Sequence, residues 1–158
     1  MQVPEFWREE IWHPLSVHLP IALIILATAF KLLSLKFKTY TNTTSILIFG
    51  SGIFSWISYY TGSLADGVVS RTLCDPTVLK THENYAYYLS ILVSVVGVFE
   101  IIRLTSLIKQ KKLLNLFITL ALVASSAGVA YVGHLGATLV YQQAAGVYTP
   151  SEDCSEFE

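Results

Sequence analysis

The stretch PLSVHLPIALIILATAFKLLSL, residues 14–35, decides the fold class of this chain. It is long enough to cross a bilayer core of about 30 Å as an α-helix, which takes about 20 residues. Three further apolar stretches follow, at about residues 45–65, 82–104 and 113–142. They are continuous rather than alternating, which favours helices over the strands of a membrane barrel. The sequence therefore predicts an all-α, integral membrane four-helix bundle in a single domain, residues 1–158.

The composition agrees with a membrane protein and excludes two other classes. Of the 158 residues, 53% are hydrophobic and 13% are charged, whereas a soluble domain has about 25% charged residues. So few charges leave too little polar surface to hydrate a soluble domain of this size. The net charge of −1, without a basic arm, excludes a nucleic-acid-binding protein. No internal repeat is evident in the sequence.

Lysine and arginine are concentrated at one end of the predicted bundle. Seven of the ten lie near the connections between the first and second spans and between the third and fourth: Lys31, Lys36, Lys38, Arg103, Lys109, Lys111 and Lys112. Only Arg8, Arg71 and Lys80 lie toward the other end. Because cytoplasmic connections carry an excess of basic residues, we expect both termini on the outer side. Glu100 has Arg103 three residues further on, which predicts a structural ion pair near the cytoplasmic interface.

The segments outside the spans are short. Residues 1–13 lack a basic region followed by an apolar core, so we interpret them as an interfacial segment rather than a signal peptide. Residues 143–158 form an outer tail. Cys74 and Cys154 both fall on the outer side, where disulfides persist. We therefore predict a Cys74–Cys154 bridge, with two free thiols or a metal pair as the alternatives.

Four histidines, His13, His18, His82 and His134, all fall in the outer third of the predicted bundle. Ionisable groups within a membrane segment are costly, face the bundle interior and mark function. Histidines at the interface can also be solvated residues of the polar belt, and this alternative is stronger for His13 and His82, which begin their spans.

We expect His18 and His134 to be the two axial ligands of a haem b, because neutral imidazole ligates haem iron. Gly133 and Gly136 flank His134 and leave room beside its imidazole. His13 and His18 are five residues apart, about 140° around a helix, so they cannot both serve one axial pair.

His13 and His82 would then form a second site or a hydrogen-bonding shell around the first. A compact zinc or copper site that uses several of the histidines with Asp66 or Glu83 is the rival to haem.

Two stretches resemble a known family. HPLSVHLPIAL, residues 13–23, and GHLGATLVY, residues 133–141, are similar to motifs of the DUF2231 family of predicted bacterial membrane proteins. Thr61, Gly62 and Asp66 approximate a T-G-x-x-D element of that family, with one extra residue. Gln143 stands where the family pattern has a later histidine. The resemblance implies a four-span protein of a bacterial inner membrane, with a periplasmic outer side, and supports the importance of the histidines.

Together these features predict a membrane haem b protein that transfers electrons near the periplasmic face. No catalytic residues are predicted, so we expect an electron-transfer or accessory subunit rather than a stand-alone enzyme. The acidic outer surface would dock a basic, soluble periplasmic electron carrier, and a larger respiratory complex is another possible partner. The alternatives are a zinc- or copper-binding membrane protein and a non-redox structural subunit of a larger membrane complex.

Overall fold

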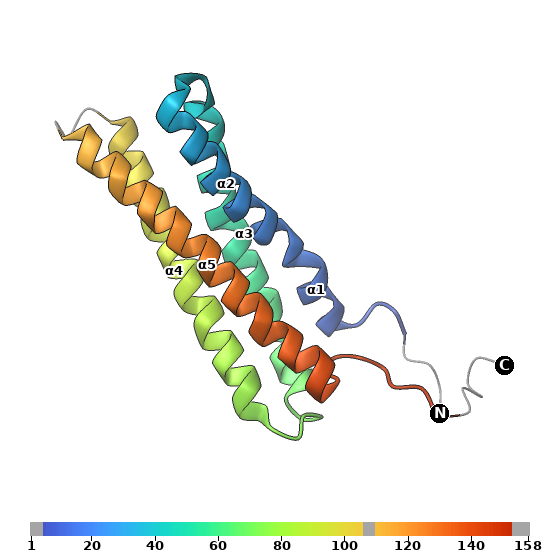
Figure 1. Ribbon diagram of the computed structural model, residues 1–158. Coiled ribbons are helices and arrows are strands. Elements are labelled where there is room, and N and C mark those ends of the chain that lie inside the picture. The colour runs from blue at the N-terminus through green and yellow to red at the C-terminus, as the bar shows by residue number, and fades with distance from the viewer. Residues whose placement is uncertain (1–4, 106–109, 153–158) are drawn as a thin grey trace.

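The computed structural model describes residues 5–105 and 110–152, which are largely helical and contain no strand (Figure 1). The elements follow one another as η1 (Glu9–Ile11), α1 (Trp12–Ser16), α2 (His18–Lys36), η2 (Lys38–Tyr40), α3 (Thr41–Val69), α4 (Pro76–Leu104) and α5 (Lys111–Gln143). The prediction of an all-α fold is confirmed.

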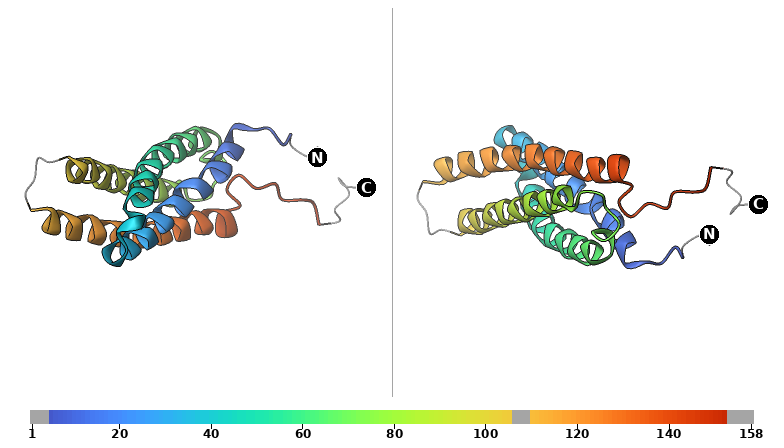
Figure 2. Two further views of the ribbon diagram at one scale, coloured as in Figure 1. Left: turned by 90° about the horizontal axis from the view of Figure 1, so that it is seen from above. Right: turned by 90° about the horizontal axis from the view of Figure 1, so that it is seen from below.

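The four long helices run side by side, and their connections define two ends of the bundle (Figures 1 and 2). One end holds the start of α1, the connection from α3 to α4 and the end of α5. We call it the histidine end, because His13 and His82 lie there. The other end holds the connection from α2 to α3, the end of α4 and the start of α5. We call it the basic end, because Lys36, Lys38 and Lys111 lie there.

Within the part of the chain that the structure describes, three helical segments are long and apolar enough to cross a membrane: Glu9–Lys36, Pro76–Leu104 and Lys111–Gln143. The sequence predicts four spans, and the difference lies in α3. This helix has 29 residues, enough to cross a bilayer core, but its interior face is rich in hydroxyl groups. The buried polar residues on it are Thr44, Ser45, Ser51, Ser55 and Ser58. They lower the hydropathy of α3, which packs between α2 and α4.

A break in the backbone hydrogen bonding separates α1 from α2. Pro20 has no backbone N–H, so the carbonyl of Ser16 loses the donor that a continuous helix would supply. The break falls at Val17, which ends α1 and begins α2. Val17 keeps helical backbone angles, φ −63° and ψ −26°, so α1 and α2 continue as one helical segment. α1 is in contact with α3.

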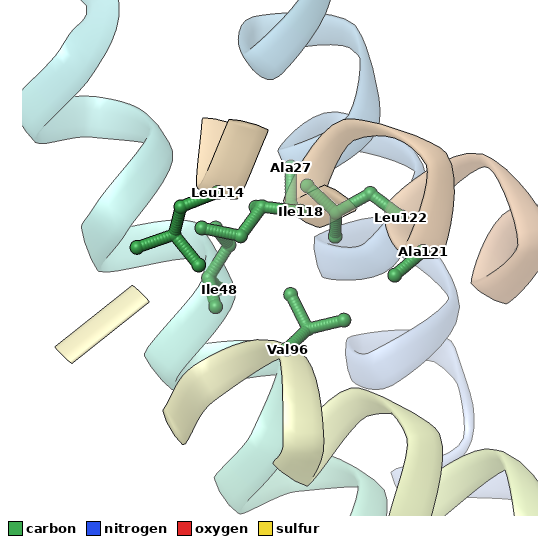
Figure 3. Close-up of a cluster of buried hydrophobic side chains, with 7 residues drawn as sticks. All are labelled: Ala27, Ile48, Val96, Leu114, Ile118, Ala121 and Leu122. Atoms are coloured by element: carbon green, nitrogen blue, oxygen red, sulfur yellow. The ribbon is translucent and has the colours of Figure 1, made fainter. Parts of the chain in front are cut away.

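An apolar core fills the half of the bundle toward the basic end. Its buried residues come from all four long helices and are shown in Figure 3: Ala27, Ile48, Val96, Leu114, Ile118, Ala121 and Leu122. A smaller cluster of Ile24, Val93 and Val129 continues toward the histidine end. The apolar core thus stops short of the histidines, which leaves the histidine end for polar groups.

The two halves of the chain repeat one another, contrary to the expectation from the sequence. Equivalent positions differ by 69 in residue number between α1–α2 and α4, and by 74 between α3 and α5. The equivalent buried pairs are Ile24 and Val93, Ala27 and Val96, Lys31 and Glu100, Thr44 and Ile118, Ser45 and Thr119, Ile48 and Leu122, Ser51 and Ser125, Ser55 and Val129, and Ala65 and Leu139. The side chains differ at most of these positions, which hides the repeat in the sequence. The bundle is therefore a pseudo-two-fold arrangement of two helical hairpins.

Candidate functional site

His13 lies on α1 and is held against α3. Its Nδ1 is 3.1 Å from the carbonyl oxygen of Ser58. Because a carbonyl only accepts, Nδ1 carries the proton and donates, which leaves the lone pair of a neutral ring on Nε2. The ring lies over Gly62, one turn further along α3, where an added Cβ would be only 2.9 Å from Cε1 of His13. Gly62 is therefore required for this position of the imidazole.

His82 makes the equivalent contacts from α4 to α5. Its Nδ1 is 3.2 Å from the carbonyl oxygen of Val132 and donates to it. The ring lies over Gly136, where an added Cβ would be 3.2 Å from Cε1 of His82. Val132 and Gly136 are the residues of α5 equivalent to Ser58 and Gly62 of α3. The pseudo-two-fold relationship therefore extends to the hydrogen bond and the glycine of each histidine.

The two imidazoles meet between the helices. Their ring centroids are 6.1 Å apart, and the ring planes are at 79° to each other. Both histidines are half-buried, and among the described residues neither Nε2 has a hydrogen-bond partner. A metal-bound histidine commonly donates its other N–H to a carbonyl, which fixes the tautomer and the ring orientation. The His13–His82 pair, as we call it, has this arrangement on both sides.

The separation of the rings suits two ligands of one metal ion. Bonds of about 2.0–2.1 Å from an ion to each Nε2 place the two ring centres about 5–6.5 Å apart, depending on the angle at the ion. The observed 6.1 Å falls in this range. Chemically, the site offers two neutral nitrogen ligands at the histidine end of the bundle.

His18 and His134 lie elsewhere. Both are exposed, and within the described ranges no ring contact joins them. His18 is five residues after His13, about 140° further around the helix, so the two side chains point in different directions. The predicted axial pairing of His18 with His134 stays a prediction. The structure brings together the two histidines that the sequence analysis assigned to the second site or the shell.

The other predicted ligands do not complete a larger site. Glu83 is paired with Lys80 instead. Asp66 is half-buried on α3, and no hydrogen bond from its carboxylate to either histidine is found in the described part of the chain. Across residues 5–105 and 110–152, no group of three or more His, Cys, Asp or Glu side chains is placed to hold a metal ion. The two histidines are thus the ligand set that the described residues offer.

The predicted disulfide lies partly outside the described residues. Cys74 is exposed in the connection from α3 to α4, and Cys154 falls outside the ranges that the structure describes. The bridge between them stays a prediction.

The predicted ion pair of Glu100 with Arg103 is confirmed at the other end of the bundle. Glu100 is 0% exposed. Arg103 donates to both of its carboxylate oxygens, at 2.7 Å from Nε and 2.5 Å from the guanidinium NH2 group. Ser45 donates a third hydrogen bond from α3. This cluster lies far along α4 from His82 and belongs to a different site.

Sequence reasoning missed Ser58, Val132 and Gly62 as parts of the histidine site, and it assigned Gly136 to His134 rather than to His82. Their role comes from backbone carbonyls and from the lack of a side chain, neither of which a search for ligand residues detects. His13 and Gly62 are 49 residues apart, whereas His82 and Gly136 are 54 apart, so a search for one fixed spacing does not find them.

The comparisons with known proteins agree with the membrane fold. The sequence model of a family described as "Predicted membrane protein (DUF2231)" matches residues 11–149, which confirms the resemblance. No curated protein and no solved structure matches the chain.

Proposed function

We propose a function for this chain on the premise that it belongs to the DUF2231 family of predicted membrane proteins, whose model spans residues 11–149. The chain is a membrane electron-transfer protein in which His13 and His82 would hold one haem b. The observation that carries this proposal is the 6.1 Å separation of the two rings, each oriented by a hydrogen bond from Nδ1 to a helix carbonyl.

The number of protein ligands favours haem over a bare metal ion. A structural zinc site uses four protein ligands and a catalytic zinc site uses three. The described residues offer no group of three or more such side chains. A porphyrin supplies four nitrogens of its own, so haem iron needs only two axial ligands from the protein. His13 and His82 are sufficient for haem, whereas zinc or copper would need ligands from elsewhere.

Two axial histidines also favour electron transfer over catalysis. If His13 and His82 both held the iron, the protein would leave no open position there for a substrate. The chemistry that the group would supply is one-electron exchange, with a reduced one-electron donor in the membrane and an oxidised, soluble electron carrier as the two partners.

The placement of the site in the cell follows from the charge distribution. The basic end carries most of the lysines and arginines, so the positive-inside rule assigns it to the cytoplasm and the histidine end to the periplasm of a bacterial inner membrane. The acidic residues of the histidine end would attract a basic carrier there. On this orientation Cys74 and Cys154 face an oxidising compartment, and the bridge between them would tie the tail to the connection from α3 to α4.

The absorption spectrum of the purified, full-length chain tests this function. We expect a Soret band and, on reduction, sharp α and β bands typical of two-histidine ligation. If the protein is colourless and contains stoichiometric zinc or copper, the site is a zinc or copper site and the haem proposal is wrong. A colourless protein without metal would overturn the proposal and leave a structural subunit of a larger complex.

A further inference from the structure

A second polar site lies at the basic end of the bundle, where α2 ends and α3 begins. A cavity of about 320 Å³ opens there, at the small end of the range of about 300–1,000 Å³ for ligand pockets. Its polar lining includes Lys31, Lys38, Arg103, Asn115, Thr41 and Thr44. These residues come from α2, α3, α4, α5 and the short η2, so all four long helices contribute to the lining of the cavity.

Lys31 brings a buried positive charge to this cavity. Its side chain is part of a residue that is 2% exposed, and its Nζ donates to Oδ1 of Asn115, a neutral amide. Among the described residues neither Lys31 nor Lys38 forms an ion pair. A buried ammonium group is costly unless an anion or several hydrogen bonds compensate it. Lys31 thus has two further N–H donors available on the cavity side of the bundle.

The neighbouring carboxylate of Glu100 does not compensate the charge of Lys31. Glu100 attracts Lys31 electrostatically, but its two carboxylate oxygens already accept from Arg103 and Ser45. The four charged residues Lys31, Lys38, Glu100 and Arg103 together carry a net charge of +2. The cluster is therefore complementary to an anion that none of the described side chains provides.

The start of α3 adds to the positive potential. α3 has 29 residues and begins at Thr41, in the wall of the cavity. The N–H of Thr41 donates to the carbonyl of Lys38 in η2, and no side chain caps the start of α3. The positive end of the helix dipole attracts anions. The hydroxyls of Thr41 and Thr44 offer additional polar groups, and Thr44 is 1% exposed.

We propose that this cavity binds a phosphate group, carried by an anionic phospholipid or as a free phosphate. Lysine, arginine, hydroxyl and helix N–H donors are the groups that recognise phosphate in proteins. The cavity lies where α2 and α4 end and α3 and α5 begin, at the level where a membrane helix meets lipid headgroups. Basic pockets between membrane helices bind anionic headgroups at this level. The phosphate site rests on different residues from the haem site and does not depend on it.

Binding to the full-length protein, purified in a neutral detergent, tests the site. Three probes are compared by native mass spectrometry: phosphatidylglycerol, phosphatidylcholine and inorganic phosphate. Lys38→Gln is the main variant, because Lys38 is exposed and lines the cavity, so its loss does not disturb the core. Lys36→Gln is the matched control, since Lys36 makes the same charge change two residues away and does not line the cavity.

We expect phosphatidylglycerol to bind, and Lys38→Gln to weaken its affinity about fivefold, as for one basic residue near an anionic headgroup. Lys36→Gln should change it less than twofold, and phosphatidylcholine should bind much more weakly. Binding of inorganic phosphate with the same dependence on Lys38 would identify a free phosphate as the ligand. Equal affinities for both lipids, an equal loss in Lys36→Gln and Lys38→Gln, or no binding of any probe would overturn the proposal.

Discussion

The imidazole rings of His13 and His82 lie 6.1 Å apart, and each donates from Nδ1 to a helix carbonyl one turn before a glycine on which its ring rests. The two residues come from equivalent positions of two helical hairpins. The pair therefore lies near the pseudo-two-fold axis, where each hairpin contributes the same contact. A site of this kind uses both hairpins, so neither half of the chain holds it alone.

Gly62→Ala should disturb the histidine site. The new Cβ would be 2.9 Å from Cε1 and 3.0 Å from Nδ1 of His13, so the ring that donates to Ser58 would have to shift. We expect a loss of about 1–3 kcal/mol in the free energy of unfolding, the range for overpacked sites, together with weaker haem retention. Thermal unfolding and haem content of the purified variant measure both effects.

Gly133→Ala is the matched control for Gly62→Ala, because nothing lies within 4 Å of an added Cβ at Gly133. It should leave haem content unchanged and, since alanine favours helices over glycine, stabilise the protein by up to about 1 kcal/mol. Equal haem loss in both variants would show that the close approach of His13 to Gly62 has no role in the site.

Glu100→Ala should be strongly destabilising. It leaves Arg103 in the interior without the carboxylate to which its guanidinium donates. Breaking a buried pair by removing one partner costs about 3–5 kcal/mol. Equilibrium unfolding in detergent measures the loss. The double variant Glu100→Ala/Arg103→Ala should lose less free energy of unfolding than the sum of the losses in the two single variants. Strict additivity would mean that the two side chains do not interact.

Asp75 should stabilise the N-terminus of α4 in a pH-dependent way. Its Oδ1 accepts hydrogen bonds from the hydroxyl and the backbone N–H of Thr77, which hold the pKa of Asp75 below its ordinary value of 3.8. Because the pKa is lower in the folded state, the stabilisation is full above the unfolded pKa and is lost as the pH falls through the folded one.

Melting temperatures of the wild type and of Asp75→Ala, measured side by side from neutral pH to about pH 2, test this cap. The wild type should melt higher at neutral pH, and the difference should shrink below about pH 4. A difference that is the same at every pH would assign the effect to something other than the ionised carboxylate.

The membrane fold could be predicted from the sequence because it depends on the length and hydropathy of continuous stretches. Residues 14–35 and 113–142 needed no tertiary information to be assigned as helices. The burial of the hydroxyl-rich face of α3 was harder to predict. Serines that donate to carbonyls of their own helix lower its hydropathy but can still be buried. Ser51 and Ser55, for example, donate to carbonyls of α3 itself.

The choice of the histidine pair could not be made from spacing alone. The 140° between His13 and His18 separates their directions around the helix. Which of the two is half-buried against α3 depends on the packing of the helices, and the structure shows that it is His13. The internal repeat carries the missing information: His82 is the equivalent of His13, whereas Tyr87 is the equivalent of His18 and Tyr60 that of His134.

The haem content of four single variants, His13→Ala, His82→Ala, His18→Ala and His134→Ala, tests the central claim most directly. Haem per polypeptide and the reduced α band are measured for each purified full-length protein. We predict that His13→Ala and His82→Ala lose the two-histidine spectrum, while His18→Ala and His134→Ala keep it. The reverse result, with haem kept without His13 and His82 but lost without His18 and His134, would contradict this account.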